Sequence, residues 1–285
     1  MKEHRKKSRC SWQVFGIINK RIAMNQPKGY VDTQYLQTTA TLLQDFKQRS
    51  YEWMQIQPGH VVLDVGCGPA SDTVALARWV GSSGQVCGVD YDPEMIVEAD
   101  YRAMQAGVNS WVNHQQGSTD ELPYPSNHFD SCRSERVFQH LKNPERALEE
   151  MVRVTKPGGR IVVWDADWGT LTIDTDEVET ERKLVRIMAE ITVNNGYSGR
   201  QLYRMFKKKS LTGVVFEANT MFFDRYELLR TIVGFDYVES RALAMGEVTQ
   251  QELDRWHKSL EESDREGCFF GSVNGILISG EKPER

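Results

Sequence analysis

The stretch that most constrains the fold runs from Val61 to Ala70 and reads VVLDVGCGPA. An unbroken apolar run that ends in closely spaced glycines is typical of a buried parallel strand followed by a tight turn. Residues 71–80 then space their apolar side chains as a helix does. Glycines let a ligand approach the backbone, and a helix that begins there offers free N–H groups. The pattern therefore predicts a strand, a turn and a helix that bind a nucleotide-like ligand.

Strand and helix patterns continue to alternate along the chain. We expect a helical stretch within 33–54, strands at 60–65, 84–90, 110–115, 129–134 and 160–165, and helices at 71–80, 93–106 and 145–154. This alternation predicts five strand–helix units and a parallel sheet. Beyond Trp168 the pattern changes to helices at 177–193, 199–209, 225–233 and 249–262 and two late strands at 212–219 and 269–281.

Composition excludes several classes of protein. The 285 residues are 40% hydrophobic and 26% charged, which is an ordinary globular composition, and the net charge of −5 offers no basic surface for a nucleic-acid binder. Five cysteines without C-x-x-C spacing indicate neither disulfides nor a metal site. No apolar run approaches the roughly 18 residues of a membrane span. We expect a cytoplasmic protein with a small-molecule partner and no stable membrane insertion, and a homo-oligomer stays open.

Two acidic residues narrow the class of ligand that this loop is expected to bind. Asp90 closes the second strand, where a carboxylate can accept hydrogen bonds from ribose hydroxyls. A nicotinamide site would carry G-x-G-x-x-G, but no third glycine follows Gly66 and Gly68. Asp64, two residues before the first glycine, can order the loop and hold an ammonium directly or through water. A ligand with an amino acid end therefore fits better than a nicotinamide cofactor.

The chain resembles the class I S-adenosylmethionine-dependent methyltransferases, in the small-molecule group with the "methyltransferase 11" type of domain. The matching motifs read LDVGCG, GVD, LPYP leading to FD, SERVFQHL and RVTKPGG, at 63–68, 88–90, 122–125 and 129–130, 134–141 and 153–159. The resemblance implies an α/β, Rossmann-like sheet of seven strands whose last two form an antiparallel hairpin. It also implies an N-terminal helical lid (1–57), a cofactor-binding core (58–168), a helical lid insertion (169–210) and the C-terminal part of the core sheet (211–285).

The resemblance also implies a role for individual residues in binding S-adenosylmethionine. Asp64, Gly66 and Gly68 would border the methionine part, and Arg133 would face the methionine end. Asp90 would bind the ribose. Tyr91 and Met95 would lie beside and below the adenine, and Ser118 with Thr119 stands where many relatives carry an aspartate that binds the adenine amino group.

Methyl transfer is an in-line displacement, so the enzyme mainly aligns the reactants and accepts a proton where the acceptor is a hydroxyl. His140, Asp165 and Asp167 are the candidates for proton transfer, because they follow strands at the edge where such sheets bind ligands. Each also has a structural interpretation, His140 as a loop-ordering residue and the aspartates as loop caps. An acceptor pocket is predicted from aromatic and polar residues outside the core, namely Tyr30, Tyr35, Trp164, Trp168, Tyr197 and Arg200.

The leading interpretation is a methyltransferase that acts on a small molecule of specialised, natural-product metabolism, at oxygen, nitrogen or carbon. Phe129 to Ser134 lacks the Asn-Pro-Pro-Tyr type of sequence, which argues against methylation of DNA. Three alternatives remain open. They are a quinone or lipid-precursor methyltransferase, a protein that binds S-adenosylmethionine without turnover, and a nicotinamide dehydrogenase.

Overall fold

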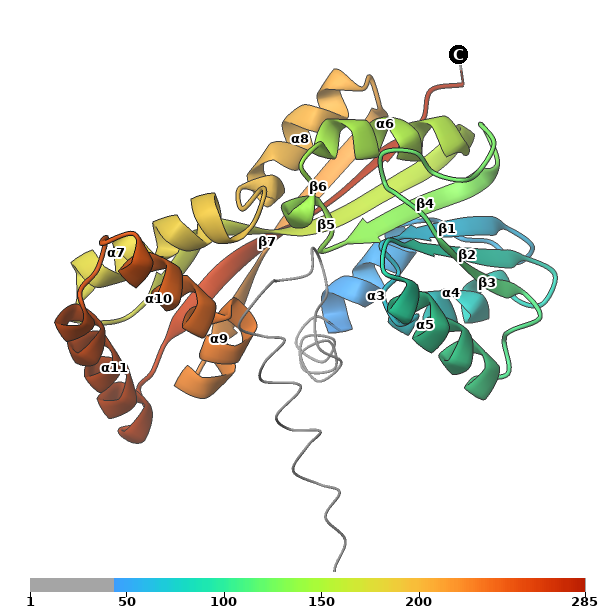
Figure 1. Cartoon of the computed structure of the whole chain (residues 1–285). Helices are drawn as coiled ribbons and strands as arrows, with labels where there is room; N and C mark the ends of the chain where they lie inside the picture. Colours follow the sequence, from blue (N-terminus) through green and yellow to red (C-terminus); the bar gives the residue numbers. More distant parts are fainter. Residues whose placement is uncertain (1–43, 285) are drawn as a thin grey trace, which may run out of the picture. The chain divides into compact units, whose positions relative to one another are not determined.

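The fold is seen in a computed structural model that describes residues 44–284. Seven strands form one sheet in the order β3-β2-β1-β4-β5-β7-β6 (Figure 1). Strands β1 to β5 run parallel, and β7 pairs antiparallel with both β5 and β6. The predicted Rossmann-like sheet with a late antiparallel hairpin is therefore confirmed. The expectations for Tyr30 and Tyr35 lie outside the described residues.

The elements of the first half lie close to their predicted positions. They are α3 (Gln44–Trp53), β1 (Val61–Val65), α4 (Ser71–Val80), β2 (Gln85–Asp90), α5 (Pro93–Gln105), β3 (Val112–Gln116), β4 (Phe129–Glu135), η1 (Phe138–His140), α6 (Pro144–Val154) and β5 (Thr155–Ile173). Two predictions were wrong. The count of five strand–helix units was too high, because no helix lies between β3 and β4, and β5 extends far beyond Asp165 because its end pairs with β7 at Thr172 and Ile173.

The second half contains more helix than the pattern predicted. Its elements are α7 (Val178–Ile187), η2 (Met188–Thr192), α8 (Ser198–Lys208), β6 (Thr212–Phe223), α9 (Tyr226–Val233), α10 (Phe235–Ala244), α11 (Gln250–Arg265) and β7 (Gly271–Glu281). Helix α10 was not predicted. It follows α9 after Gly234, whose φ of 70° ends one helix and starts the next. A left-handed residue at a helix end is readily supplied by glycine.

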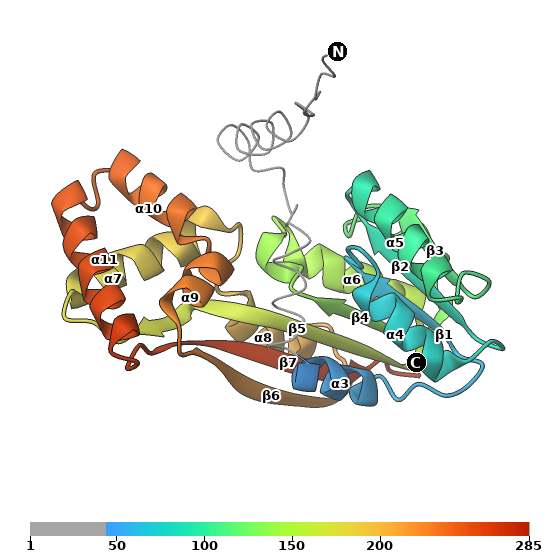
Figure 2. The ribbon, with the colours of Figure 1, turned by 90° about the horizontal axis from the view of Figure 1, so that it is seen from below.

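The helices cover the sheet on two faces and beyond one end. Apolar side chains of α3, α4 and α5 pack on one face of the sheet, and those of α6 and α8 pack on the other (Figures 1 and 2). A third apolar cluster joins α7, α9, α10 and α11 to the far ends of β5, β6 and β7. The carboxyl end of β5 therefore lies within this helical part.

Gly275 on β7 tests how tightly this sheet packs. A methyl group on it would lie 2.3 Å from Cζ2 of Trp164, whose ring also stacks on Phe46. We expect Gly275→Ala to lower the free energy of unfolding by about 1–3 kcal/mol, the usual cost of overpacking. Urea denaturation measures this loss. In a Trp164→Phe background the loss should be smaller, and equal losses in both backgrounds would contradict this account.

Candidate active site

The loop after β1 depends on Gly66 for its path. Gly66 has a φ of 76°, and its N–H donates to the Val89 carbonyl at 2.7 Å. The N–H of Cys67 donates to the same carbonyl at 3.0 Å. A Cβ on Gly66 would lie 2.2 Å from Cγ2 of Val137, in the segment that follows β4. Only glycine fits here, because the loop passes tightly between the ends of β2 and β4.

Gly68 serves a different purpose from Gly66. Its φ is 51°, and a Cβ on it would meet no protein atom within 4 Å. Its N–H donates to Asp90 Oδ2 at 2.9 Å, so the far end of β2 holds the loop. Ala70, also left-handed at a φ of 67°, starts α4 without a side-chain cap. The loop is therefore held by its backbone, and the space beside Gly68 stays open to a ligand.

Asp90 connects the glycine loop to the start of α5. Oδ1 accepts a hydrogen bond from the N–H of Asp92 and Oδ2 accepts one from the N–H of Gly68, each at 2.9 Å. Burial raises the pKa of Asp90, although these backbone donors act in the opposite direction. Carboxylate oxygens have further lone pairs for ribose hydroxyls. Its ribose-binding role stays a prediction.

The residues predicted to surround the adenine lie along the ends of β2 and β3. The side chain of Tyr91 is 67% exposed, and Met95 is buried in α5. The Gln116 amide donates to the Tyr91 carbonyl at 3.1 Å, which brings the two strand ends together. Ser118 Oγ accepts a hydrogen bond from the Asp120 N–H at 3.2 Å, and Thr119 lies within this turn. The adenine contacts of these residues stay predictions.

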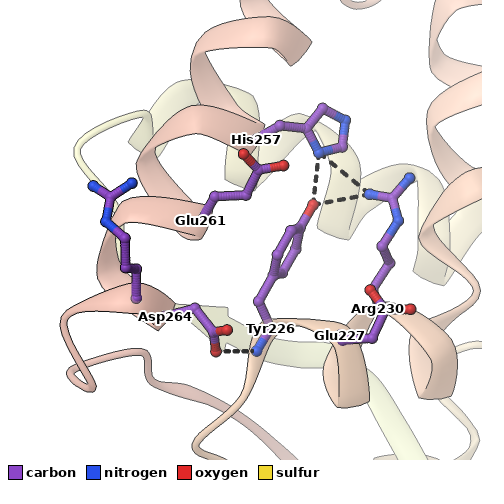
Figure 3. A pocket seen from close by; sticks show the side chains of 7 residues that line it. Tyr226, Glu227, Arg230, His257, Glu261 and Asp264 are labelled. Carbon is purple, nitrogen blue, oxygen red and sulfur yellow. Dashed lines mark hydrogen bonds between the residues drawn. The ribbon is translucent and has the colours of Figure 1, made fainter.

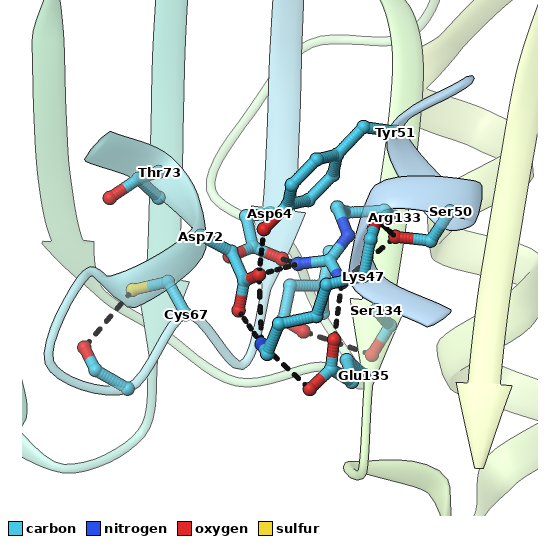
Figure 4. A network of polar contacts seen from close by, with 12 residues as sticks. Lys47, Ser50, Tyr51, Asp64, Cys67, Asp72, Thr73, Arg133, Ser134 and Glu135 are labelled. Carbon is cyan, nitrogen blue, oxygen red and sulfur yellow. Dashed lines mark hydrogen bonds and ion pairs between the residues drawn. The ribbon is translucent and has the colours of Figure 1, made fainter. Parts of the chain in front are cut away.

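Arg133 on β4 occupies the centre of a cluster of charges beside the glycine loop (Figure 4). Its side chain is 1% exposed. Nη1 lies 3.3 Å from Asp64 Oδ1 and 3.2 Å from Asp72 Oδ1, and Nη2 lies 2.7 Å from Glu135 Oε2. Arg133 and Asp64 are register partners on adjacent strands. Arg133 therefore joins β1, β4 and the start of α4 through three carboxylates.

Helix α3 supplies three further members of this cluster, which sequence reasoning missed. Lys47 Nζ lies 2.7 Å from Asp72 Oδ2 and 2.8 Å from Glu135 Oε1. The Tyr51 hydroxyl hydrogen-bonds Asp72, and Ser50 Oγ accepts from Arg133 at 3.3 Å. The spacing of these three residues was the available signal, since positions three and four apart lie on one helix face.

The cations of the cluster neutralise its carboxylates unequally. Asp72 contacts Arg133, Lys47 and Tyr51, and Glu135 contacts both cations as well. Although burial acts in the opposite direction, Arg133 and Lys47 lower the pKa of Asp72 below its usual range. Among the described residues, Arg133 is the one cation within ion-pair distance of Asp64, and burial raises the pKa of Asp64. Asp64 is therefore the carboxylate best placed to bind a further cation, such as an ammonium.

Asp165 is fully buried and bound by backbone groups. Oδ2 accepts a hydrogen bond from the Gln139 N–H at 3.0 Å, and Oδ1 accepts one from the Ala166 N–H at 2.8 Å. Burial raises the pKa of Asp165 to about 7. Because both oxygens are used, the geometry favours a role in ordering the segment after β4 over a role as a base.

Asp167 meets two other predicted site residues. Arg200 Nε lies 2.5 Å from Asp167 Oδ2, and the Arg200 guanidinium lies 4.9 Å from the centre of the Tyr197 ring. The Tyr197 hydroxyl donates to Glu190 at 2.9 Å. The structure therefore brings together a catalytic candidate and two of the residues predicted to line the acceptor pocket.

His140 and the two tryptophans have different surroundings. The His140 carbonyl accepts a hydrogen bond from Asn194 at 2.7 Å, and His140 is exposed. Trp164 is buried against α3, and Trp168 is buried in the helical part and donates to Gln139 at 2.5 Å. These contacts favour packing roles for both tryptophans. The predicted aromatic pocket stays a prediction.

A cavity of about 570 Å³ lies between α9 and α11 (Figure 3). The Tyr226 hydroxyl lies 2.6 Å from His257 Nδ1 and accepts a hydrogen bond from Arg230 at 2.8 Å. These polar side chains of the cavity wall therefore bond to one another. None of its lining residues comes from the glycine loop or the charge cluster. This cavity is therefore separate from the candidate active site.

Comparison with known proteins identifies the family. A family model described as a methyltransferase domain matches residues 56–218, more than half of the chain. The chain is 32% identical over 249 residues to an uncharacterized 37.1 kDa protein in transposon TN4556 of Streptomyces fradiae, covering 87% of this chain and 70% of that protein. The chain belongs to the methyltransferase-domain family and is a class I S-adenosylmethionine-dependent methyltransferase.

Two further comparisons are narrower. One covers part of the chain, and the other concerns the fold alone. The demethylmenaquinone methyltransferase of Desulfitobacterium hafniense is 30% identical over 120 residues, which cover 42% of this chain and 47% of that protein. The match thus spans about half of that relative. The YcgJ protein of Bacillus subtilis has a TM-score of 0.61 at 22% identity, covering 85% of this chain and 100% of that chain. This second likeness concerns the fold.

The two loop glycines give a matched pair of variants. Gly66→Ala meets both a positive φ and Val137, so we expect it to lower the free energy of unfolding by about 2–5 kcal/mol. Gly68→Ala meets only the backbone strain of about 1–2 kcal/mol. Its methyl group would enter the open space and weaken S-adenosylhomocysteine binding about tenfold or more. Urea denaturation and calorimetry separate the two effects. A folded Gly68→Ala protein with unchanged affinity would contradict the assignment of this space.

Proposed function

We propose that the enzyme transfers the methyl group of S-adenosylmethionine to a small molecule of specialised, natural-product metabolism, at oxygen, nitrogen or carbon. The observation that carries the proposal is the open space beside Gly68, whose N–H donates to the Asp90 carboxylate, in the loop that follows Asp64 on β1. The two carboxylates suit the two ends of the cofactor, since one can accept ribose hydroxyls and the other can bind an ammonium.

The residues present fit this cofactor. Asp64 would hold its ammonium, Asp90 its ribose, and Tyr91 with Met95 its adenine, while Arg133 holds Asp64 in place from β4. When bound, the cofactor supplies an electrophilic methyl group on a sulfonium. The chain's own task is to align the acceptor with that methyl group and to accept a proton where the acceptor is a hydroxyl or an amine.

Among the three candidates for proton transfer, Asp167 has the best geometry. Both oxygens of Asp165 already accept backbone hydrogen bonds, whereas Asp167 Oδ1 accepts none from the residues that the structure describes. His140 is exposed after β4, and its carbonyl, bonded to Asn194, ties that segment to the helical part. We assign the proton acceptor to Asp167.

A second candidate acceptor is a quinone or a lipid precursor. The similarity to a demethylmenaquinone methyltransferase favours it, although the match covers 47% of that protein. The family membership decides for an enzyme against a binding protein without turnover. A helix able to cross a membrane is not found among residues 44–284. We propose a cytoplasmic enzyme whose partner is a small molecule, and we propose no nucleic-acid substrate.

Ligand titration tests the cofactor assignment. We expect S-adenosylmethionine and S-adenosylhomocysteine to raise the melting temperature, because a ligand of the native state stabilises it, and NADH to have no effect. Asp90→Ala should weaken S-adenosylhomocysteine binding by about 1.5–3 kcal/mol, the scale of hydrogen bonds to a charged group. Asp92→Ala, which removes only the cap of α5, is the control. Stabilisation by NADH alone would sink the proposal.

The raised pKa of Asp64 predicts how binding depends on pH. The ionised carboxylate binds an ammonium, so lowering the pH from 8 to 5 protonates Asp64 and weakens S-adenosylhomocysteine binding. Each pH unit below the pKa costs up to about tenfold. Adenosine, which lacks the ammonium, should lose less affinity than S-adenosylhomocysteine over this pH range. Calorimetry at pH 5, 6, 7 and 8 measures both ligands, and a parallel decline of the two would show that Asp64 is not the responsible group.

A further inference from the structure

The first turn of α4 begins without a side-chain cap. Ala70 stands at the N-cap position with a φ of 67°, and an alanine side chain offers no oxygen to the free N–H groups of the turn. The Ala70 N–H donates to the Cys67 carbonyl at 3.2 Å, so the turn continues directly from the glycine loop. The position of this turn therefore depends on contacts that its other residues make with the rest of the protein.

Asp72 and Thr73 make such contacts, and they have different partners. The Asp72 carboxylate belongs to the charge cluster around Arg133. Thr73 is fully buried, and its Oγ1 lies 2.8 Å from Nε2 of His114 on β3. The same hydroxyl lies 3.4 Å from the Ala70 carbonyl, which is a weaker contact. His114 is therefore the main hydrogen-bond partner of Thr73.

A chain of hydrogen bonds runs from the exposed side of α5 to this turn. His114 Nδ1 lies 2.8 Å from Asp100 Oδ1, and the His114 side chain is 0% exposed while that of Asp100 is 60% exposed. An ionised carboxylate only accepts hydrogen bonds, so Nδ1 carries the proton. Burial lowers the pKa of His114, although Asp100 acts in the opposite direction, and the ring is neutral at pH 7. Nε2 of the neutral ring then accepts the hydrogen bond of the Thr73 hydroxyl.

Gly88 of β2 makes room for the imidazole beside the glycine loop. His114 and Gly88 are register partners on adjacent parallel strands. A Cβ on Gly88 would lie 2.7 Å from Cδ2 of His114 and 2.8 Å from Sγ of Cys67. The imidazole therefore lies over β2 next to a residue of the glycine loop, and from there it reaches the first turn of α4.

We propose that His114 is a positioning residue of the cofactor site. Its Nε2 holds the Thr73 hydroxyl, and this bond fixes the first turn of α4 and the glycine loop that leads into it. Asp100 takes part by setting which nitrogen of the ring carries the proton. No step of methyl transfer passes through the ring. The inference rests on the proposed function and adds a residue that determines how tightly its cofactor site binds.

Variants of Thr73 and His114 test whether this hydrogen bond sets the affinity. Thr73→Val keeps the shape and removes the hydroxyl, and His114→Asn removes the acceptor at the Nε2 position. Each should raise the Kd of S-adenosylhomocysteine about three- to tenfold, the scale of one hydrogen bond. Thr73→Ser and His114→Gln bring back the hydroxyl and an acceptor at that position, and they should recover most of the affinity. The double variant of Thr73→Val and His114→Asn should bind no more weakly than the weaker single variant, because both changes remove the same bond.

Thr180→Val is the matched control. Thr180 is also buried and is also the third residue of its helix, but it lies on α7 in the helical part. This change should leave the Kd unaltered. Calorimetry measures the Kd, and urea denaturation measures the free energy of unfolding of each variant. A folded Thr73→Val protein with an unchanged Kd would overturn the inference, since a purely structural role lowers only the free energy of unfolding. If His114→Asn does not fold, the two Thr73 variants decide.

Nitrogen NMR of the histidine side chains tests the hydrogen bond itself. At pH 8 the His114 ring should carry its proton on Nδ1, and His114→Gln identifies its signals by their loss. A ring with the proton on Nε2 would contradict the inference, because it could not accept a hydrogen bond from Thr73. If the unaltered protein does not bind S-adenosylhomocysteine, the proposed function itself is overturned, which is a different outcome from binding that Thr73→Val leaves unchanged.

Discussion

The burial of Arg133 is the interaction on which the site depends. A guanidinium that is 1% exposed is stable only with close carboxylate partners, because removing a charge from water is costly. Asp64, Asp72 and Glu135 meet this requirement from β1, α4 and β4, and Lys47 of α3 completes it. The charge cluster therefore links the start of α4 to the sheet and to the helix before β1.

The unequal pairing of the three carboxylates with cations affects which ligand the site can bind. Two carboxylates are well compensated, and Asp64 is left with the weakest share of positive charge. A buried group in that position favours a cationic ligand over water. The glycine loop beside it is shaped by hydrogen bonds from its backbone N–H groups to the Val89 carbonyl and to the Asp90 carboxylate.

Local sequence patterns predicted most of the helices and strands. They failed where contacts between segments far apart in the chain determine the bounds of an element or the role of a residue. The helix at 71–80 has the predicted bounds, since its apolar spacing and the glycines before it are local signals. The extension of β5 beyond Asp165 depends on pairing with β7, about a hundred residues away in the chain. The role of Asp165 was open for the same reason, because its partner Gln139 lies on another element.

The sequence by itself determined the strand, glycine loop and helix, the position of Asp90 at the end of β2, and the class of cofactor, because these depend on short-range spacing and backbone conformation. Only the tertiary structure decided that Lys47 and Tyr51 join Arg133, and that both oxygens of Asp165 accept backbone hydrogen bonds while Asp167 pairs with Arg200. The physical reason is that charge compensation and hydrogen-bond satisfaction are settled between side chains far apart in the chain, which meet only when the sheet and its helices pack.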